Sequence, residues 1–190
     1  MRFGYKFLFP MEREEAWRLV NLNIKTKNLV KHSLAVESGM RELARHFKED
    51  EQIWGLAGLL HDLDYEETKD NFDSHGLKTV EMLQGKVEDT ILYAIKSHSC
   101  KVDPKSKLDI ALYAIDPLTG LIVAACLMHP DKKLQLLDTE FIIRRFKEKR
   151  FAAGANRAQI MRCEQMEISL EEFVSLVLKG MQKVHNELGL

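Results

Sequence analysis

Apolar side chains that return every three or four residues are the feature that most limits the fold of this chain. Between residues 29 and 47 they are Leu29, Leu34, Val36, Met40, Leu43, Ala44 and Phe47, and this spacing gives an α-helix one apolar stripe. Residues 50–63 are more uniformly apolar, which indicates a buried helix. Only 4 prolines and 10 glycines interrupt the 190 residues, so we predict an all-α protein.

Several residues mark where these helices are expected to begin. Pro10, with acids close behind it, predicts the start of the first helix. Asp73 and Ser74 are candidate N-caps for a helix over residues 75–84. Ser169 and Glu172 have the spacing of a capping box, which predicts the start of the last helix, over residues 169–188.

Two segments do not fit the helical pattern directly. Pro117 lies inside the apolar run of residues 106–128. Because proline has no amide hydrogen, we expect it to bend this helix or to restart it just after Asp116. Residues 2–9 are the one candidate strand, and we do not favour a strand there.

Composition and charge exclude several classes of function. Hydrophobic residues make up 45% of the chain and charged residues 30%, with a net charge of -1, so nothing draws the whole molecule to nucleic acid or to an anionic membrane. The longest apolar run, near residues 120–128, is expected to be too short to span a bilayer. Three cysteines without a CxxC pair are typical of reduced thiols. We expect a cytoplasmic monomer or homodimer with no nucleic-acid or membrane partner.

Four of the seven histidines occupy unusual positions. His32 interrupts the apolar side of its helix, and His61 ends the most apolar segment. His75 and His98 lie near helix ends. A single histidine in such a place is usually an ordinary core or boundary residue, so only the set of four is informative. The remaining three are interpreted as solvated residues of helices or turns: His46, His129 and His185.

Two aspartates accompany these histidines. Asp62 follows His61 directly, and Asp116 lies deep inside the apolar run of residues 106–128. Asp116 alone would also serve as the cap of a helix restarted by Pro117. A buried carboxylate is costly unless it is paired, and one cation satisfies carboxylates and imidazoles together. The whole set therefore predicts a metal pocket in a helical bundle, with Fe or Mn favoured and Ni, Co or Zn as further candidates.

At these residues the sequence resembles the HD-domain superfamily of metal-dependent phosphohydrolases. The pattern of that family is a histidine, a His-Asp pair and a distant aspartate, and "AGLLHD" before the pair also resembles the family. A subset of the family carries two further histidines and holds two metals. The resemblance covers residues 28–125 and implies a single HD-type helical bundle over residues 1–190, with a helical extension at residues 135–190.

The resemblance implies a role for each matching residue. One divalent metal would be held by His32, His61, Asp62 and Asp116. A second metal would be held by His75, His98 and the bridging carboxylate of Asp62, with a hydroxide between the ions attacking phosphorus. The catalytic group would be His61, Asp62 and Asp64, with Asp64 orienting a histidine ring. If only one metal binds, His75 and His98 become donors to phosphate.

Two departures from the family pattern leave the substrate open. The HDIG group of cyclic-dinucleotide enzymes has Ile-Gly after the His-Asp pair, whereas this chain has Leu63-Asp64. The Gly-Tyr-Pro signature of a related group is absent from the sequence. The C-terminal third is similar to small bacterial HD proteins that are themselves known as predicted hydrolases.

Charged residues near these motifs have two open interpretations. Glu37, Glu66 and Glu67 would either solvate helix ends or orient the histidines. The basic segment at residues 144–157 is either a solvated face or a binding site for the substrate phosphate, because arginine binds phosphate through two parallel hydrogen bonds. The candidates for phosphate binding are Arg144, Arg145, Lys147 and Arg157.

The sequence therefore predicts an enzyme, a phosphohydrolase with two divalent transition metals. Its substrate would be a phosphate ester or phosphoanhydride of a small nucleotide-like molecule. Three alternatives stay open: a single-metal nucleoside 5′-monophosphatase, a metal- or nucleotide-binding sensor without turnover, and a set of scattered core histidines that binds no metal.

Overall fold

The computed structural model describes residues 11–190, which form helices and turns without a strand. The prediction of an all-α protein is therefore confirmed for these residues. The candidate strand at residues 2–9 and the helix start at Pro10 lie outside them. The first described helix is α1 (Arg13–Asn23).

Five helices form the centre of the molecule. They are α2 (Lys27–Phe47), α3 (Glu51–Leu60), α6 (Asp89–His98), α7 (Lys107–Met128) and α10 (Leu170–Lys183). Shorter helices connect or cover them: α4 (Tyr65–Thr68), η1 (Phe72–Ser74), α5 (Leu77–Leu83), η2 (Leu134–Leu136), α8 (Thr139–Lys147), α9 (Arg157–Met161), η3 (Arg162–Met166) and α11 (His185–Leu188).

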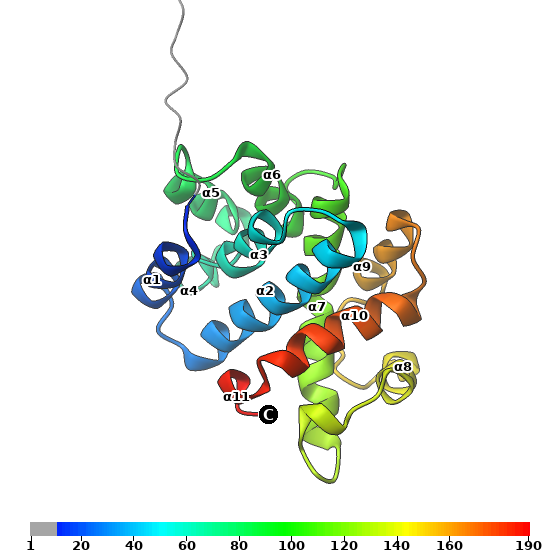
Figure 1. Ribbon diagram of the computed structural model, residues 1–190. Helices are drawn as coiled ribbons and strands as arrows, with labels where there is room; N and C mark the ends of the chain where they lie inside the picture. Colours follow the sequence, from blue (N-terminus) through cyan, green and yellow to red (C-terminus); the bar gives the residue numbers. More distant parts are fainter. Residues whose placement is uncertain (1–10) are drawn as a thin grey trace, which may run out of the picture.

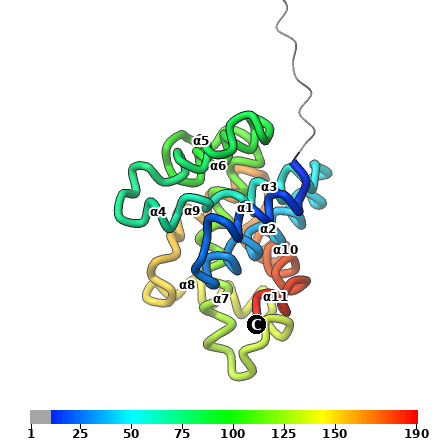
Figure 2. The backbone as a smooth tube through the Cα atoms, turned by 90° about the vertical axis from the view of Figure 1, so that its left-hand side faces the viewer, coloured from blue at the N-terminus to red at the C-terminus, as the bar shows by residue number. Residues whose placement is uncertain are grey.

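Helix α2 packs between α3 and α10 and crosses α7 (Figure 1). Val36, Met40, Leu43 and Ala44 of its apolar stripe are buried, as the periodicity predicts, whereas the other three members are partly buried against the core. Glycines allow a close approach on the other faces: a Cβ atom at Gly39 would lie 2.5 Å from Ile115 Cδ1 of α7, and one at Gly180 would lie 2.5 Å from a carbonyl oxygen of α2. A second view shows α5 and α6 at the end of the bundle opposite α11 (Figure 2).

The helix starts are capped partly as predicted. The Ser169 hydroxyl accepts the amide hydrogen of Glu172 at 3.1 Å, so Ser169 is confirmed as an N-cap, but the return bond from the Glu172 side chain that a capping box requires is not formed. The prediction for Asp73 and Ser74 is wrong, because both lie in η1 and the next helix, α5, begins after Gly76 without a side-chain cap of its own.

The expectation that Pro117 restarts a helix is also wrong. Helix α7 continues through it from Lys107 to Met128. Pro117 lacks the amide hydrogen that would bond to the carbonyl of Tyr113, four residues earlier. A side chain of α9 supplies the missing donor, because Nε2 of Gln159 donates to that carbonyl oxygen at 2.7 Å. Asp116 therefore lies within a continuous helix and not at a helix start.

The expectation that no apolar run is long enough to span a bilayer is also wrong for α7. It has 22 residues and, among the described residues, is the one helix long and apolar enough to cross a membrane. However, 61% of its most apolar window is buried inside the structure. The central helix of a compact bundle passes the same test of length and composition, so this feature is weak evidence for a membrane span.

Candidate metal centre

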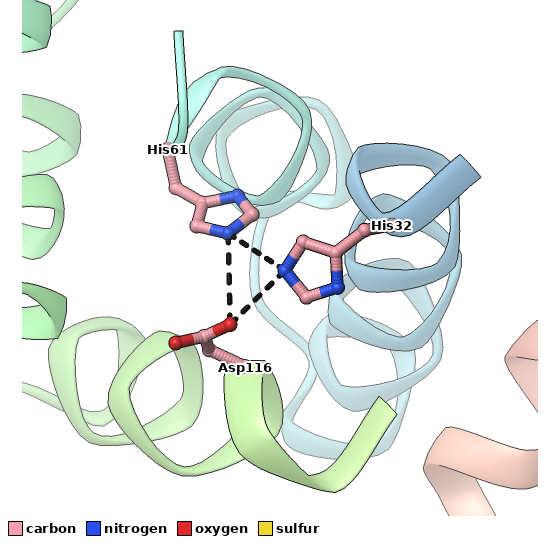
Figure 3. Close-up of side chains that lie close together, drawn as sticks. All are labelled: His32, His61 and Asp116. Atoms are coloured by element: carbon pink, nitrogen blue, oxygen red, sulfur yellow. Dashed lines mark hydrogen bonds and ion pairs between the residues drawn. The ribbon is translucent and has the colours of Figure 1, made fainter. Parts of the chain in front are cut away.

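Three side chains from different helices converge beside the centre of α7. His32 comes from α2, His61 follows the last residue of α3, and Asp116 comes from α7 (Figure 3). The Nε2 atoms of His32 and His61 are 3.2 Å apart. Oδ1 of Asp116 lies 3.0 Å from Nε2 of His32 and 3.8 Å from Nε2 of His61. Atoms that bind one ion at 2.0–2.2 Å are separated by roughly 3.0–3.6 Å, so these positions fit a common ion.

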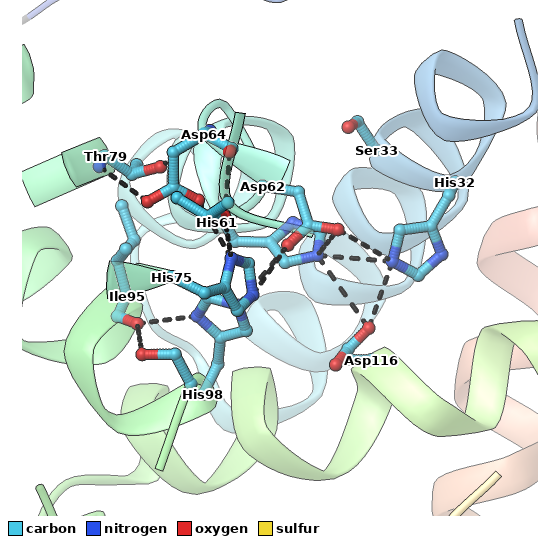
Figure 4. Close-up of polar contacts among 12 residues, drawn as sticks. His32, Ser33, His61, Asp62, Asp64, His75, Thr79, Ile95, His98 and Asp116 are labelled. Atoms are coloured by element: carbon cyan, nitrogen blue, oxygen red, sulfur yellow. Dashed lines mark hydrogen bonds and ion pairs between the residues drawn. The ribbon is translucent and has the colours of Figure 1, made fainter. Parts of the chain in front are cut away.

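Asp62 joins this group to a second one. Its Oδ2 atom lies 3.7 Å from Nε2 of His32 and 3.4 Å from Nε2 of His61. Its Oδ1 atom lies 3.4 Å from Nε2 of His75 and 3.4 Å from Nε2 of His98 (Figure 4). One carboxylate thus presents one oxygen to each pair of imidazoles. We call the six residues the ligand cluster: His32, His61, Asp62, His75, His98 and Asp116.

The outer nitrogen of each imidazole has a hydrogen-bond partner. Nδ1 of His61 lies 2.8 Å from the carbonyl oxygen of Gly58, and Nδ1 of His98 lies 2.6 Å from that of Ile95. These carbonyls belong to the last turns of α3 and α6, where a helix leaves its carbonyls without backbone partners. A histidine just at the end of a helix therefore covers such a carbonyl with Nδ1 and turns Nε2 away from it.

His32 and His75 are held by side chains instead. Nδ1 of His75 lies 2.8 Å from Oδ1 of Asp64. Nδ1 of His32 lies 3.3 Å from the hydroxyl oxygen of Thr119, and that hydroxyl donates to the Asp116 carbonyl at 2.9 Å. In all four rings the outer partner accepts a hydrogen, so this network assigns the N–H to Nδ1 and the lone pair to Nε2.

In the neutral form of the rings, which metal binding requires, this assignment makes the inner nitrogens face one another without a hydrogen between them. This holds for the pair His32 and His61, and for the pair His75 and His98, whose Nε2 atoms are 3.3 Å apart. Two lone pairs at this distance repel each other. A cation between them turns the repulsion into coordination, so the donor set fits a metal at each of the two positions.

The charges in the cluster favour ionised carboxylates. Burial opposes ionisation of Asp62, yet His61 and its neighbours hold the pKa of Asp62 well below its ordinary value. Burial also opposes ionisation of Asp116, whose pKa is lowered by His32 and His61. Burial would lower the pKa of His61, but the carboxylates of Asp62 and Asp116 raise it well above its ordinary value. Both aspartates are therefore in the form that binds a metal at neutral pH.

Asp64 lies behind the cluster and connects it to α5. Its side chain is fully buried, and its Oδ2 atom accepts the amide hydrogen of Thr79 at 3.0 Å. Asp64 thus supplies the cap that was expected from Asp73 or Ser74, and the same carboxylate fixes the His75 ring. Gly76 permits this turn, because its φ is +77° and a Cβ atom there would lie 2.3 Å from Oγ of Ser99.

The cluster is open to solvent on one side. The side chain of Asp116 is 30% exposed and that of His32 is 20% exposed, whereas Asp62 is 7% exposed and His61 is completely buried. The second imidazole pair is also covered, with His75 at 4% and His98 at 2%. Solvent therefore reaches the cluster past His32 and Asp116.

The predicted phosphate-binding residues lie on or after α8, and their contacts do not reach the cluster. Arg144 pairs with Glu140 at 2.7 Å, Arg145 pairs with Glu148 at 3.0 Å, and Lys147 is exposed. The guanidinium of Arg157 donates to main-chain carbonyls at the end of α8 and in the loop between α8 and α9, including those of Phe146, Ala152 and Ala155. Arg157 therefore holds the 152–155 loop in place.

That loop lies against the middle of α7. Ala152, Gly154 and Ala155 line a cavity of about 300 Å³ together with Pro117 and Gly120 of α7. No residue of the ligand cluster lines this cavity. Gly120 lines both this cavity and a second one that His32 and Thr119 also line.

The nearby glutamates have structural partners. Carboxylate oxygens of Glu66 accept the amide hydrogens of Lys25 and Thr26, which fixes the connection between α1 and α2. Glu37 is paired with Arg13 and Arg41, and Glu67 is paired with Lys78. None of these contacts involves a histidine of the ligand cluster. The main-chain partners at Gly58 and Ile95 were not anticipated, although their position three residues before a helix-ending histidine is visible in the sequence.

A comparison with protein families agrees with this geometry. Residues 29–121 match the family model described as the HD domain, and all six residues of the ligand cluster lie inside the match. No solved structure was found to match the chain. The family match leads to one conclusion: residues 29–121 form an HD domain, and the chain is an HD-domain protein.

Proposed function

We propose that this protein is a two-metal phosphohydrolase that cleaves a phosphate ester or phosphoanhydride of a small nucleotide-like substrate. HD domains are generally metal-dependent hydrolases. The observation that carries the proposal is the position of Asp62, whose two oxygens each face one pair of imidazole lone pairs. Two ions bound in this way would supply Lewis-acid stabilisation of phosphoryl charge and a water of lowered pKa.

The residues of the chain prepare the site in three ways. The outer hydrogen bonds fix the four rings, so no reorientation is needed when ligands bind. Burial of His61, His75 and His98 keeps bulk water from the inner side of the cluster. His32 and Asp116 form the open side, where a phosphoryl group would meet the cluster.

Several parts of the proposal extend beyond the cluster. Fe or Mn is the proposed metal, with Ni, Co or Zn as alternatives. Arg144, Arg145 and Lys147 stay candidates for binding substrate phosphate, and in this role Arg157 would act through the loop that it holds. The proposed setting is cytoplasmic, and the proposed state is a monomer or homodimer.

The test is elemental analysis of protein purified without chelator, together with a screen for phosphate release. Wild type is compared with His75→Ala, which removes one ligand of the second pair. His129→Ala is the matched control, because His129 lies after α7 and its ring pairs with Asp131. We expect about two metals per chain in wild type and in the control, about one in His75→Ala, and metal-dependent phosphate release that the His75 variant loses.

Other results would replace the proposal. One metal per chain in all three proteins, with activity on nucleoside monophosphates, would indicate the single-metal enzyme. Two bound metals without phosphate release from any ester would indicate a sensor. Protein that binds no metal even after reconstitution with Fe or Mn would exclude both the two-metal and the one-metal enzyme.

A further inference from the structure

A pocket beside the ligand cluster lies between α2, α7 and residues 188–190, and we call it the side pocket. It has a volume of about 400 Å³, and both His32 and Thr119 line it. His32 thus faces the cluster with Nε2 and also forms part of the wall of the pocket. We infer that the side pocket holds the nucleoside part of a nucleoside monophosphate whose phosphate lies at the cluster. This inference rests on the proposed function.

The lining of the pocket is suited to a flat, uncharged ring. Ala35, Val123 and Leu188 line it together with Leu127, while Lys31 and Asn28 supply polar groups from α2. No lining residue is acidic. Purine and pyrimidine rings have apolar faces and edges rich in carbonyl and ring-nitrogen acceptors, which match aliphatic walls and one cationic donor.

Lys31 is placed to read the acceptor edge. It directly precedes His32 on α2, and its ammonium lies against Gly189, where a Cβ atom would come within 2.9 Å of it. Gly189 has a φ of +70°, which favours glycine at this position. The turn after α11 therefore brings the chain against the Lys31 ammonium in the pocket wall.

The size of the pocket argues for one nucleoside and against two. Pockets for small ligands measure roughly 300–1,000 Å³, and the side pocket is near the lower limit at about 400 Å³. A dinucleoside polyphosphate or a cyclic dinucleotide would have to leave its second base outside. Within the pocket, Lys31 supplies the cation and Val123 part of the apolar wall, so these two are the proposed specificity-determining residues of the enzyme.

The test measures binding of adenosine and uridine, which have no phosphate and cannot be hydrolysed. Isothermal titration is performed on metal-loaded protein, for wild type and for Val123→Phe, which fills the pocket. Val87→Phe is the matched control, because Val87 is also a half-buried valine but lies outside the pocket. We expect the Kd of the nucleoside to rise at least tenfold in Val123→Phe and to stay within twofold of wild type in Val87→Phe, with unchanged metal content in both.

A second pair of variants tests the cation. Lys31→Met keeps the length of the side chain and removes its charge, and we expect a Kd several-fold higher than that of wild type. Lys27→Met, at an exposed position one turn earlier, is the control. Failure of wild type to bind either nucleoside at millimolar concentration, or equal binding by Val123→Phe, would overturn the inference. Neither result bears on metal content or phosphate release, so the proposed function is judged separately.

Discussion

At the level of single residues, the four histidines of the ligand cluster differ in what holds them. Main-chain carbonyls hold His61 and His98, and a hydroxyl holds His32. Only His75 is held by a carboxylate, that of Asp64, at 2.8 Å. A carboxylate on the outer nitrogen raises the basicity of an imidazole more than a neutral acceptor does. Asp64 would therefore act on the proposed second metal position through His75.

Replacement of Asp64 by asparagine tests this positioning role. Its carboxylate accepts hydrogens from both His75 and the amide of Thr79, so the NH₂ group of an asparagine must oppose one of these donors. We expect the affinity of the second metal to fall about 10–100-fold, while the first metal binds as in wild type. A titration against a chromogenic chelator measures both sites. Asp73→Asn, at an exposed position in η1, is the control, and equal losses at both metal sites would contradict this role.

The sequence indicates the six residues that the structure brings together but not all of their partners, and their role as ligands stays a prediction. His32, His61, Asp62 and Asp116 are conspicuous because a charged or polar group in an apolar helix needs a partner. The fixing of His75 by Asp64 was proposed without a means to choose that histidine. The choice depends on the turn at Gly76, which brings His75 back onto Asp64, and no local pattern specifies where such a turn leads.

At the level of helices, α7 shows why local rules gave the wrong result at Pro117. A proline inside a helix removes one hydrogen bond, and an isolated helix would bend or end there. In this fold Gln159 of α9 donates to the Tyr113 carbonyl that proline leaves without a backbone donor, so the helix continues. The helices themselves were predictable because their periodicity is local. The hydrogen bond that replaces the missing one at Pro117 was not, because its donor is far away in the sequence.

A double-mutant cycle tests whether Gln159 replaces the missing amide of Pro117. In wild type, Gln159→Leu leaves the Tyr113 carbonyl without its donor, and we expect a loss of about 1–2 kcal/mol in the free energy of unfolding. In Pro117→Ala the main chain supplies an amide at that place, so the same change should have a clearly smaller effect. Urea unfolding of the metal-free proteins measures all four states. Equal effects of Gln159→Leu in both backgrounds would show that the two residues are not coupled.

At the level of the whole molecule, one buried carboxylate adds ion pairs to the packed interface between the HD domain and α10. Glu42 of α2 is 2% exposed and is paired with Arg45 of its own helix and with Lys179 and Lys183 of α10. Glu42 and Lys183 are 141 residues apart in the sequence. An extension after the HD core was predictable from its periodicity, but this contact was not, because nothing local distinguishes Glu42 from a solvated glutamate.

Glu42→Gln should make the protein less stable at neutral pH and less sensitive to acid. Burial opposes ionisation of Glu42, but Lys183, Lys179 and Arg45 lower its pKa below the ordinary value. A carboxylate whose pKa is lower in the folded state than in the unfolded state stabilises the protein at pH values above the unfolded-state pKa, which is about 4.3. This contribution is lost as the pH falls through the folded-state pKa. The lysine side chains are more than half exposed, so we expect a loss of only about 1–2 kcal/mol at pH 7.

Urea unfolding of wild type and variant from pH 7 to pH 3 measures this difference directly. The ligand cluster titrates in the same way in both proteins, so subtraction isolates Glu42. The gap in free energy should narrow steadily below pH of about 4.3. Glu140→Gln is the control, because Glu140 is 81% exposed in its pair with Arg144 and should change stability little. A gap that stays constant over the whole range would mean that Glu42 contributes through packing, and the link between the HD domain and α10 would then not depend on its charge.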